Sequence, residues 1–161
     1  MVFSPAYFDE KYDMILEAIT EKNLFSNIVL IIGRHGTGKT QLLSFLAERK
    51  NFRLINVGLC LSQELRQYSD KERLQFVESS LKRLIPDEGT VLLDNTEILF
   101  QPELKLNVMR LILNLGRSRK DPVIISVAGI RQNGCLYFSE PPFSDNKQYD
   151  IHDFYIVDMG E

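Results

Sequence analysis

The sequence predicts an α/β protein built on a doubly wound, mostly parallel sheet of five strands. Short, continuously apolar segments, typical of strands that are buried on both faces, alternate with longer segments whose apolar residues recur every three or four positions, as in amphipathic helices. The composition agrees, because 44% of the 161 residues are hydrophobic and 25% are charged, the balance of a globular protein. We therefore expect a single domain over residues 1–161.

The expected elements follow from the same patterns. The strands are predicted at residues 28–32, 52–57, 90–94, 122–128 and 153–158. Helices are predicted at residues 5–21, 41–50, 61–85 and 102–116. Ser4 is a suitable N-cap for the first of these helices, and Ser69-Asp70 is expected to break the third in two.

An irregular excursion is expected at residues 131–150, before the last strand. It contains three aromatic residues that we expect to be exposed, Tyr137, Phe138 and Phe143. The segment is long for a structureless connection, which favours local β structure or a function, either partner binding or a surface flap.

Residues 33–40 form a phosphate-binding loop motif. They spell G-R-H-G-T-G-K-T, which fits G-x-x-x-x-G-K-[ST], and they lie between an apolar strand and an amphipathic helix, as the motif requires. Glycines let the backbone curl so that amide groups point at phosphate oxygens. The predicted nucleotide-binding residues are Gly33, Arg34, His35, Gly36, Thr37, Gly38, Lys39, Thr40 and Gln41. Lys39 is expected to reach the β and γ phosphates of ATP and Thr40 to bind Mg²⁺, whereas His35 is expected to face solvent.

A second nucleotide motif ends the apolar strand at residues 90–94. Its terminal Asp94 is expected to share the Mg²⁺ site with Thr40. Hydrolysis also needs a group that activates water, and we expect either Glu97 as the base or Asn95 as a weaker polarising group with slow turnover. Ser126 is expected to be either a polar sensor of the γ-phosphate or a buried core hydroxyl.

Three arginines are candidates for an additional cation at the transition state, acting in their own chain or in a neighbouring subunit. Arg117 and Arg119 end a helix, where cations are also favourable for structural reasons, and Arg131 follows a strand. The complete set of catalytic candidates is Lys39, Asp94, Asn95, Glu97, Arg117, Arg119 and Arg131.

Net charge, cysteine spacing and the lengths of the apolar segments limit the other function classes. The formal net charge of −3 provides no global basic field, so any contact with DNA must be local. Cys60 and Cys135 lack metal-ligand spacing and are expected to be reduced structural thiols. We expect a cytoplasmic protein with no membrane partner, because neither a signal sequence nor a spanning segment is evident.

The order of these motifs resembles the AAA+ and STAND classes of P-loop ATPase over nearly the whole chain. On this resemblance Gly33, Gly38, Lys39 and Thr40 match Walker A, and Asp94 matches Walker B. Two features depart from the pattern. Asn95 replaces the usual Glu, which puts fast hydrolysis in doubt, and we expect no helical lid after the last strand, which puts the usual ring in doubt.

More narrowly, residues 91–100, V-L-L-D-N-T-E-I-L-F, resemble the BrxF family of small P-loop proteins from type 3 BREX phage-defence systems. The resemblance implies a bacterial cytosolic component of a multiprotein complex that acts on phage DNA together with other defence-system proteins. The expected function is an ATP-dependent switch that assembles a homo-oligomer and engages DNA or a partner. A small-molecule kinase and a nucleotide-bound scaffold without turnover remain alternatives, and the missing N-K-x-D motif favours ATP over GTP.

Overall fold

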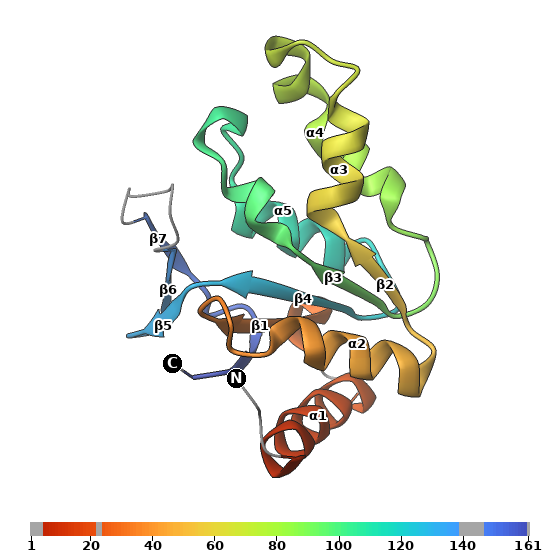
Figure 1. Ribbon diagram of the computed structural model, residues 1–161, viewed down its shortest axis with the longest axis vertical. Coiled ribbons are helices and arrows are strands. Elements are labelled where there is room, and N and C mark those ends of the chain that lie inside the picture. The colour runs from red at the N-terminus through yellow and green to blue at the C-terminus, as the bar shows by residue number, and fades with distance from the viewer. Residues whose placement is uncertain (1–4, 22–23, 139–146, 161) are drawn as a thin grey trace.

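The computed structural model describes residues 5–21, 24–138 and 147–160, and it confirms the predicted α/β class (Figure 1). A five-stranded sheet has the order β2-β3-β4-β1-β8, and all its strand pairs are parallel. Its strands are β1 (Ile28–Gly33), β2 (Arg53–Asn56), β3 (Val91–Asp94), β4 (Val123–Ala128) and β8 (Tyr155–Asp158). All five strands therefore occur where the sequence predicts them.

Five α-helices and three 3₁₀ helices connect the strands in the described part of the chain. The α-helices are α1 (Pro5–Thr20), α2 (Lys39–Lys50), α3 (Val57–Leu65), α4 (Asp70–Leu84) and α5 (Val108–Arg117). The 3₁₀ helices are η1 (Phe25–Asn27), η2 (Thr96–Phe100) and η3 (Pro102–Leu104). Within the described residues, no helix has the length and apolar character needed to cross a membrane.

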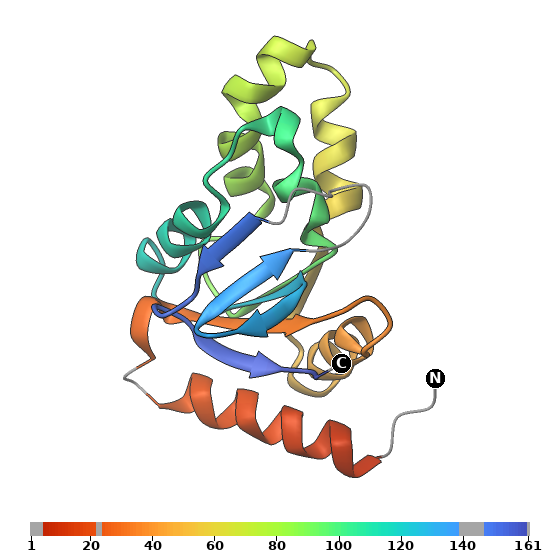
Figure 2. The same cartoon turned by 90° about the vertical axis from the view of Figure 1, so that its left-hand side faces the viewer.

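The helices form two layers around the sheet, which is the doubly wound arrangement (Figures 1 and 2). Successive residues of an extended strand point to opposite faces, and β1 shows the consequence. Val29 and Ile31 pack with α1 and α2, whereas Leu30 and Ile32 belong to the core on the side of α3, α4 and α5. Both faces of β1 are buried, which explains why its sequence is continuously apolar.

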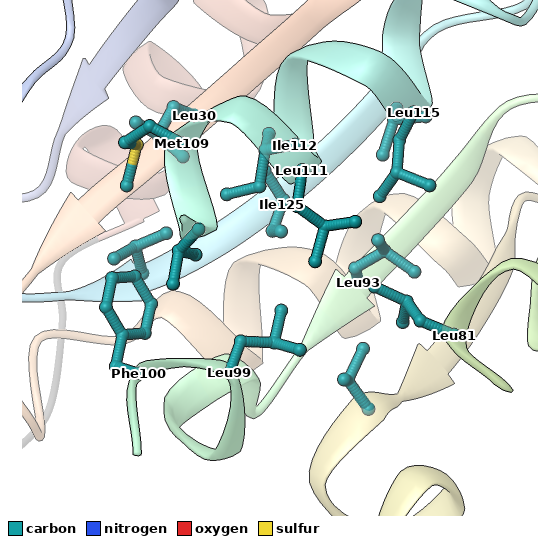
Figure 3. Packing of buried hydrophobic residues seen from close by; sticks show 14 of the residues in the cluster. Leu30, Leu81, Leu93, Leu99, Phe100, Met109, Leu111, Ile112, Leu115 and Ile125 are labelled. Carbon is teal, nitrogen blue, oxygen red and sulfur yellow. The ribbon is translucent and has the colours of Figure 1, made fainter. Parts of the chain in front are cut away.

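The larger core lies between the sheet and α5, with η2 and α4 at its border (Figure 3). In this core, Leu93 of β3 and Ile125 of β4 lie under Leu111, Ile112 and Leu115 of α5. Their side chains are almost completely removed from water. This packing fixes β3 and β4 relative to each other and thus the groups at their carboxyl ends.

The boundaries of two predicted helices differ from the structure. The strand predicted at residues 52–57 is one residue too long at each end. At its carboxyl end, the Asn56 side chain accepts a hydrogen bond from Leu59 N at 3.0 Å and starts α3 at Val57. The helix predicted from Pro102 begins as η3, and α5 starts only after Asn107, whose Oδ1 accepts from Arg110 N at 3.3 Å.

The predicted break at Ser69-Asp70 is confirmed by a capping box that starts α4. Ser69 Oγ accepts from Glu72 N at 3.3 Å, and Glu72 Oε1 accepts from Ser69 N at 3.0 Å. The hydrogen bond from the Ser69 backbone, followed by one from the Ser69 side chain, stabilises the ionised carboxylate and holds the pKa of Glu72 below its usual value. The α3–α4 hairpin consequently turns back and extends beyond the edge of the sheet (Figure 1).

The segment between β4 and β8 contains the local β structure that its length favours. Strands β5 (Ile130–Gln132), β6 (Cys135–Phe138) and β7 (Lys147–Asp150) form a small antiparallel sheet (Figure 2). The prediction that Phe138 is exposed is wrong, because its side chain is 4% exposed and stacks on Phe100 with ring centroids 4.7 Å apart. Tyr137 is half-buried, while Phe143 and the predicted cap Ser4 lie outside the described residues.

Candidate functional site

The phosphate loop lies at the carboxyl edge of the parallel sheet, where β1 ends between β4 and β8. Gly36 and Gly38 have φ values of 84° and 93°, which only glycine adopts without strain. A Cβ added to Gly33 would lie 2.4 Å from Thr37 Oγ1 and 2.9 Å from Met159 Cβ. The sequence motif is therefore matched by a tight backbone turn that opens directly into α2.

Hydrogen bonds from two side chains hold this turn together. Thr37 N and Oγ1 both donate to the Arg34 carbonyl, at 3.2 and 2.7 Å. Lys39 Nζ donates to the carbonyls of Gly33 and Arg34 at 2.7 and 2.8 Å, and the lysine is only 9% exposed. The loop thus keeps an ammonium group beside its backbone, at the start of a helix whose dipole also favours anions.

The remaining predicted nucleotide-binding residues lie on both sides of the buried part of the loop. Arg34, His35, Thr40 and Gln41 are exposed, and the solvent-facing position predicted for His35 is confirmed. Residues 33–41 therefore form a turn whose central residues are buried, while the flanking residues are exposed and accessible to a ligand.

The structure brings Thr40 and Asp94 together, as predicted for a metal site. Asp94 ends β3 and is 5% exposed, and its Oδ2 accepts a hydrogen bond from Thr40 Oγ1 at 2.8 Å. Its Oδ1 accepts from Ser126 Oγ at 2.6 Å. Both carboxylate oxygens are therefore oriented by hydroxyl groups that come from two different elements, α2 and β4.

Ser126 lies inside β4 and is 2% exposed. Its hydroxyl donates to the Asp94 carboxylate, so Ser126 occupies the buried position that the sequence offered as one alternative. Its role as a sensor of the γ-phosphate stays a prediction. The adjoining turn is fixed as well, because Thr96 Oγ1 donates to the Ser126 carbonyl at 2.6 Å. Sequence reasoning missed Thr96; its only signal is a small polar residue just after the strand that carries Asp94.

The donor set at this position suits magnesium. Hydroxyl and carboxylate oxygens are hard ligands, and Mg²⁺ is usually bound by one or two such protein groups together with waters and substrate phosphates. Within the described residues, no cluster of three or more His, Cys, Asp or Glu could hold a metal ion by itself. Thr40 and Asp94 therefore fit a metal that arrives with a nucleotide.

The two groups predicted to activate water follow Asp94 in the chain. Asn95 is exposed and adopts left-handed φ and ψ values of 54° and 55°, and Glu97 lies half-buried in the first turn of η2. Both lie near the carboxyl end of β3, on the same edge of the sheet as the phosphate loop. The role of either residue in hydrolysis stays a prediction.

Arg117 and Arg119 lie at the opposite edge of the sheet. They precede β4, and the Arg119 guanidinium donates to the carbonyls of Pro86 and Gly89, which precede β3. The six residues of β4 span about 20 Å, so neither arginine reaches the phosphate loop of its own chain. Arg119 instead ties together two loops, and a role toward a neighbouring subunit stays a prediction for both.

Arg131 is closer to the phosphate loop. It is an exposed residue of β5, and this strand follows Gly129, whose N–H donates to the Gly33 carbonyl at 3.1 Å. Of the three predicted arginines, only Arg131 therefore lies at the carboxyl edge of the sheet. Its catalytic role stays a prediction.

One contact near the loop was not expected from the sequence. The Tyr7 hydroxyl of α1 donates to the Met159 carbonyl, and Met159 N donates to the Ile32 carbonyl at 2.8 Å. Burial, together with the nearby carboxylates of Asp158 and Glu10, raises the pKa of Tyr7. Helix α1 is thus attached to the strand end that delivers Gly33.

Comparison with known proteins gives similarity only to solved structures. No family model and no curated protein matches the chain. Caenorhabditis elegans PCH-2 is 18% identical, with a TM-score of 0.43, over 94% of this chain and 41% of its own. The replication initiator DnaA bound to AMPPCP and single-stranded DNA is 17% identical, with a TM-score of 0.47, over 98% and 51%. AMPPCP-bound DnaA from Aquifex aeolicus is 19% identical, with a TM-score of 0.41, over 99% and 48%. The chain thus spans about half, or less, of the length of these proteins.

Proposed function

We propose that the chain binds ATP with Mg²⁺ and hydrolyses it slowly. The observation that carries this proposal is the hydrogen bond of 2.8 Å between Thr40 Oγ1 and Asp94 Oδ2, next to a loop that holds the Lys39 ammonium. Thr40 and Asp94 would hold the metal, and Lys39 would contact the β and γ phosphates. Magnesium, when bound, supplies positive charge that stabilises the phosphates during transfer.

Ser126 is proposed to position Asp94 for the metal. Replacing Ser126 with alanine is expected to weaken ATP binding in magnesium by about 10-fold, because a ligand carboxylate loses the hydroxyl that orients it. Binding in EDTA should be unchanged, and Ser126→Thr should restore the magnesium effect because it retains the hydroxyl. Isothermal titration calorimetry in the two buffers measures this difference. An equal loss in both buffers would show a general structural role instead.

Slow turnover is proposed because Asn95, and not a glutamate, follows Asp94. Glu97 is the candidate base, so Glu97→Gln is expected to lower phosphate release by about 100-fold and to leave ATP binding intact. Glu103→Gln is the matched control, since Glu103 is an exposed acid in the neighbouring η3. Unchanged phosphate release in Glu97→Gln would show that Glu97 is not the base and would favour Asn95 as the group that polarises the water.

The cellular role proposed here is an assembly switch. ATP would order a homo-oligomer that engages other defence-system proteins or DNA in a bacterial, cytoplasmic BREX-type complex, and hydrolysis would release it. The resemblance of residues 91–100 to the BrxF family supports this assignment. An arginine from a neighbouring subunit would then complete the nucleotide site.

Sedimentation velocity with and without ATP and Mg²⁺, beside phosphate release on the same sample, tests the switch. Wild type is expected to assemble only with ATP and Mg²⁺, and Lys39→Ala is expected to stay in its smaller form. A monomer in every condition would instead favour one of two alternatives, a small-molecule kinase or a nucleotide-bound scaffold. Transfer of phosphate to a nucleoside or metabolite would identify the kinase, and stable ATP binding without any transfer would identify the scaffold.

The partners require separate tests. Copurification with neighbouring defence proteins is expected, and its absence together with a lack of functional dependence would remove the BREX assignment. Direct contact with DNA phosphates predicts a steep loss of affinity with rising salt. No binding to DNA at low salt would exclude that contact.

A further inference from the structure

A hollow surface lies away from the phosphate loop, between the α3–α4 hairpin and the segment that contains η2 and η3. It is a cavity of about 720 Å³. A neighbouring cavity of about 420 Å³ shares Leu74, Leu104 and Lys105 with it, so the two form one continuous groove along α4. We propose that this α4 groove binds an acidic, partly apolar segment of a partner protein.

The floor of the α4 groove is apolar. Leu65 and Leu104 are buried beneath it, and Ile98 of η2 lies beside them. Leu74 of α4, which lines both cavities, is 37% exposed and is one of the few large apolar residues among those described that are classed as exposed. This floor suits the apolar side chains of a peptide that lies in the groove.

The rim of the α4 groove carries an excess of positive charge. Its acid Asp70 is paired with Arg73, with Oδ1 and the guanidinium nitrogen 3.3 Å apart. The remaining charges that line the groove are the cations of Arg66, Lys71 and Lys105 against the carboxylates of Glu103 and Glu78, which leaves an excess of one positive charge. Since the whole chain has a net charge of −3, this local reversal of sign selects for an acidic ligand.

The composition of the groove favours a peptide over single-stranded nucleic acid. Sites for single strands combine cations with aromatic side chains on which bases stack. Among the described residues that line the α4 groove, none is aromatic, and leucine and isoleucine provide the contact area. Acidic residues alternating with apolar ones would match both the rim and the floor.

The α4 groove is separate from the proposed nucleotide site, because residues 33–41 and Asp94 do not line it. Peptide binding can therefore be measured independently of ATP.

A library of short random peptides displayed on phage is selected on the immobilised wild-type protein, and the affinity of the enriched peptides is then measured by fluorescence anisotropy. Labelled oligothymidylate serves as the nucleic-acid probe.

Matched charge reversals locate the binding. The double variant Lys71→Glu/Lys105→Glu changes the rim of the α4 groove, and Lys82→Glu/Lys120→Glu makes the same change in net charge at exposed lysines outside it. Enriched peptides are expected to be rich in acidic and large apolar residues, and the groove variant should bind them at least roughly tenfold more weakly. The control variant and Lys39→Ala should bind them like wild type, with thermal melts confirming that each variant is folded.

Three outcomes would overturn the proposal. The first is a selection that enriches no acidic peptide, and the second is equal affinity of the enriched peptides for the groove variant and wild type. Groove-dependent binding of oligothymidylate without peptide binding would assign the surface to nucleic acid. If the wild-type chain binds the peptides but does not bind ATP, the proposed function is contradicted and the α4 groove assignment stays in place.

Discussion

Lys39→Ala is expected to weaken ATP binding by about 100-fold. One hydrogen bond from the charged ammonium group to phosphate, worth up to about 3 kcal/mol, accounts for this loss. The Lys39 ammonium is already held beside the loop by the carbonyls of Gly33 and Arg34 at 2.7 and 2.8 Å. Because the charge is in place before the ligand arrives, little ordering of the side chain opposes binding.

Isothermal titration calorimetry with ATP and Mg²⁺ measures the effect of Lys39→Ala. Lys50→Ala is the matched control, because Lys50 is an exposed lysine at the far end of the same helix α2 and should leave the affinity unchanged. The melting temperatures of both variants show whether the loop remains folded. Equal ATP affinity for Lys39→Ala and Lys50→Ala would remove Lys39 from the nucleotide site.

Gly116→Ala is expected to lower the free energy of unfolding by about 3 kcal/mol, because it overpacks a tightly closed contact. A Cβ at position 116 would lie 2.1 Å from the Ser26 carbonyl oxygen and 2.8 Å from Cγ1 and Cδ1 of Ile28. The opposing chain is held in place, since Asn27 Nδ2 donates to the carbonyls of Gly116 and Asp121 at 3.3 and 2.9 Å. The backbone of η1 therefore cannot withdraw without losing these bonds.

The expected fall in melting temperature for Gly116→Ala is about 6 to 12 °C. Asn114→Ala, at an exposed position of the same helix, is the control and should change stability little. Gly116 lies near the amino edge of the sheet, so ATP affinity measured well below the melting temperature should equal that of wild type. An unchanged melting temperature would contradict the close packing of α5 on η1.

The strands and the phosphate loop could be predicted because their signals are local. Burial on both faces requires continuously apolar sequences such as residues 28–32, and the tight turn after β1 requires glycine at positions 36 and 38. Helix boundaries were less accurate, because Asn56 and Asn107 act as caps within otherwise ambiguous patterns. The burial of Phe138 depends on Phe100, a contact between distant segments that no local pattern reveals.

Some features of the candidate site could likewise be predicted from local motifs, whereas others could not. Thr40 and Asp94 belong to motifs with fixed positions on parallel strands, so their contact follows from the fold. The hydrogen bond from Ser126 to Asp94 depends on the register of β4 against its neighbours, which periodicity does not give. Arg119 appeared equivalent to Arg131 in sequence, yet the direction of the strands places them at opposite edges of the sheet.

Calorimetric titration of ATP into the wild-type chain, in magnesium and then in EDTA, tests the central claim most directly. We predict one ATP bound per chain in magnesium, with clearly weaker binding in EDTA and in the variant Asp94→Asn, which alters the carboxylate that contacts Thr40. The absence of ATP binding in magnesium would contradict the account. Binding that neither EDTA nor Asp94→Asn alters would contradict the assignment of Thr40 and Asp94 to the metal.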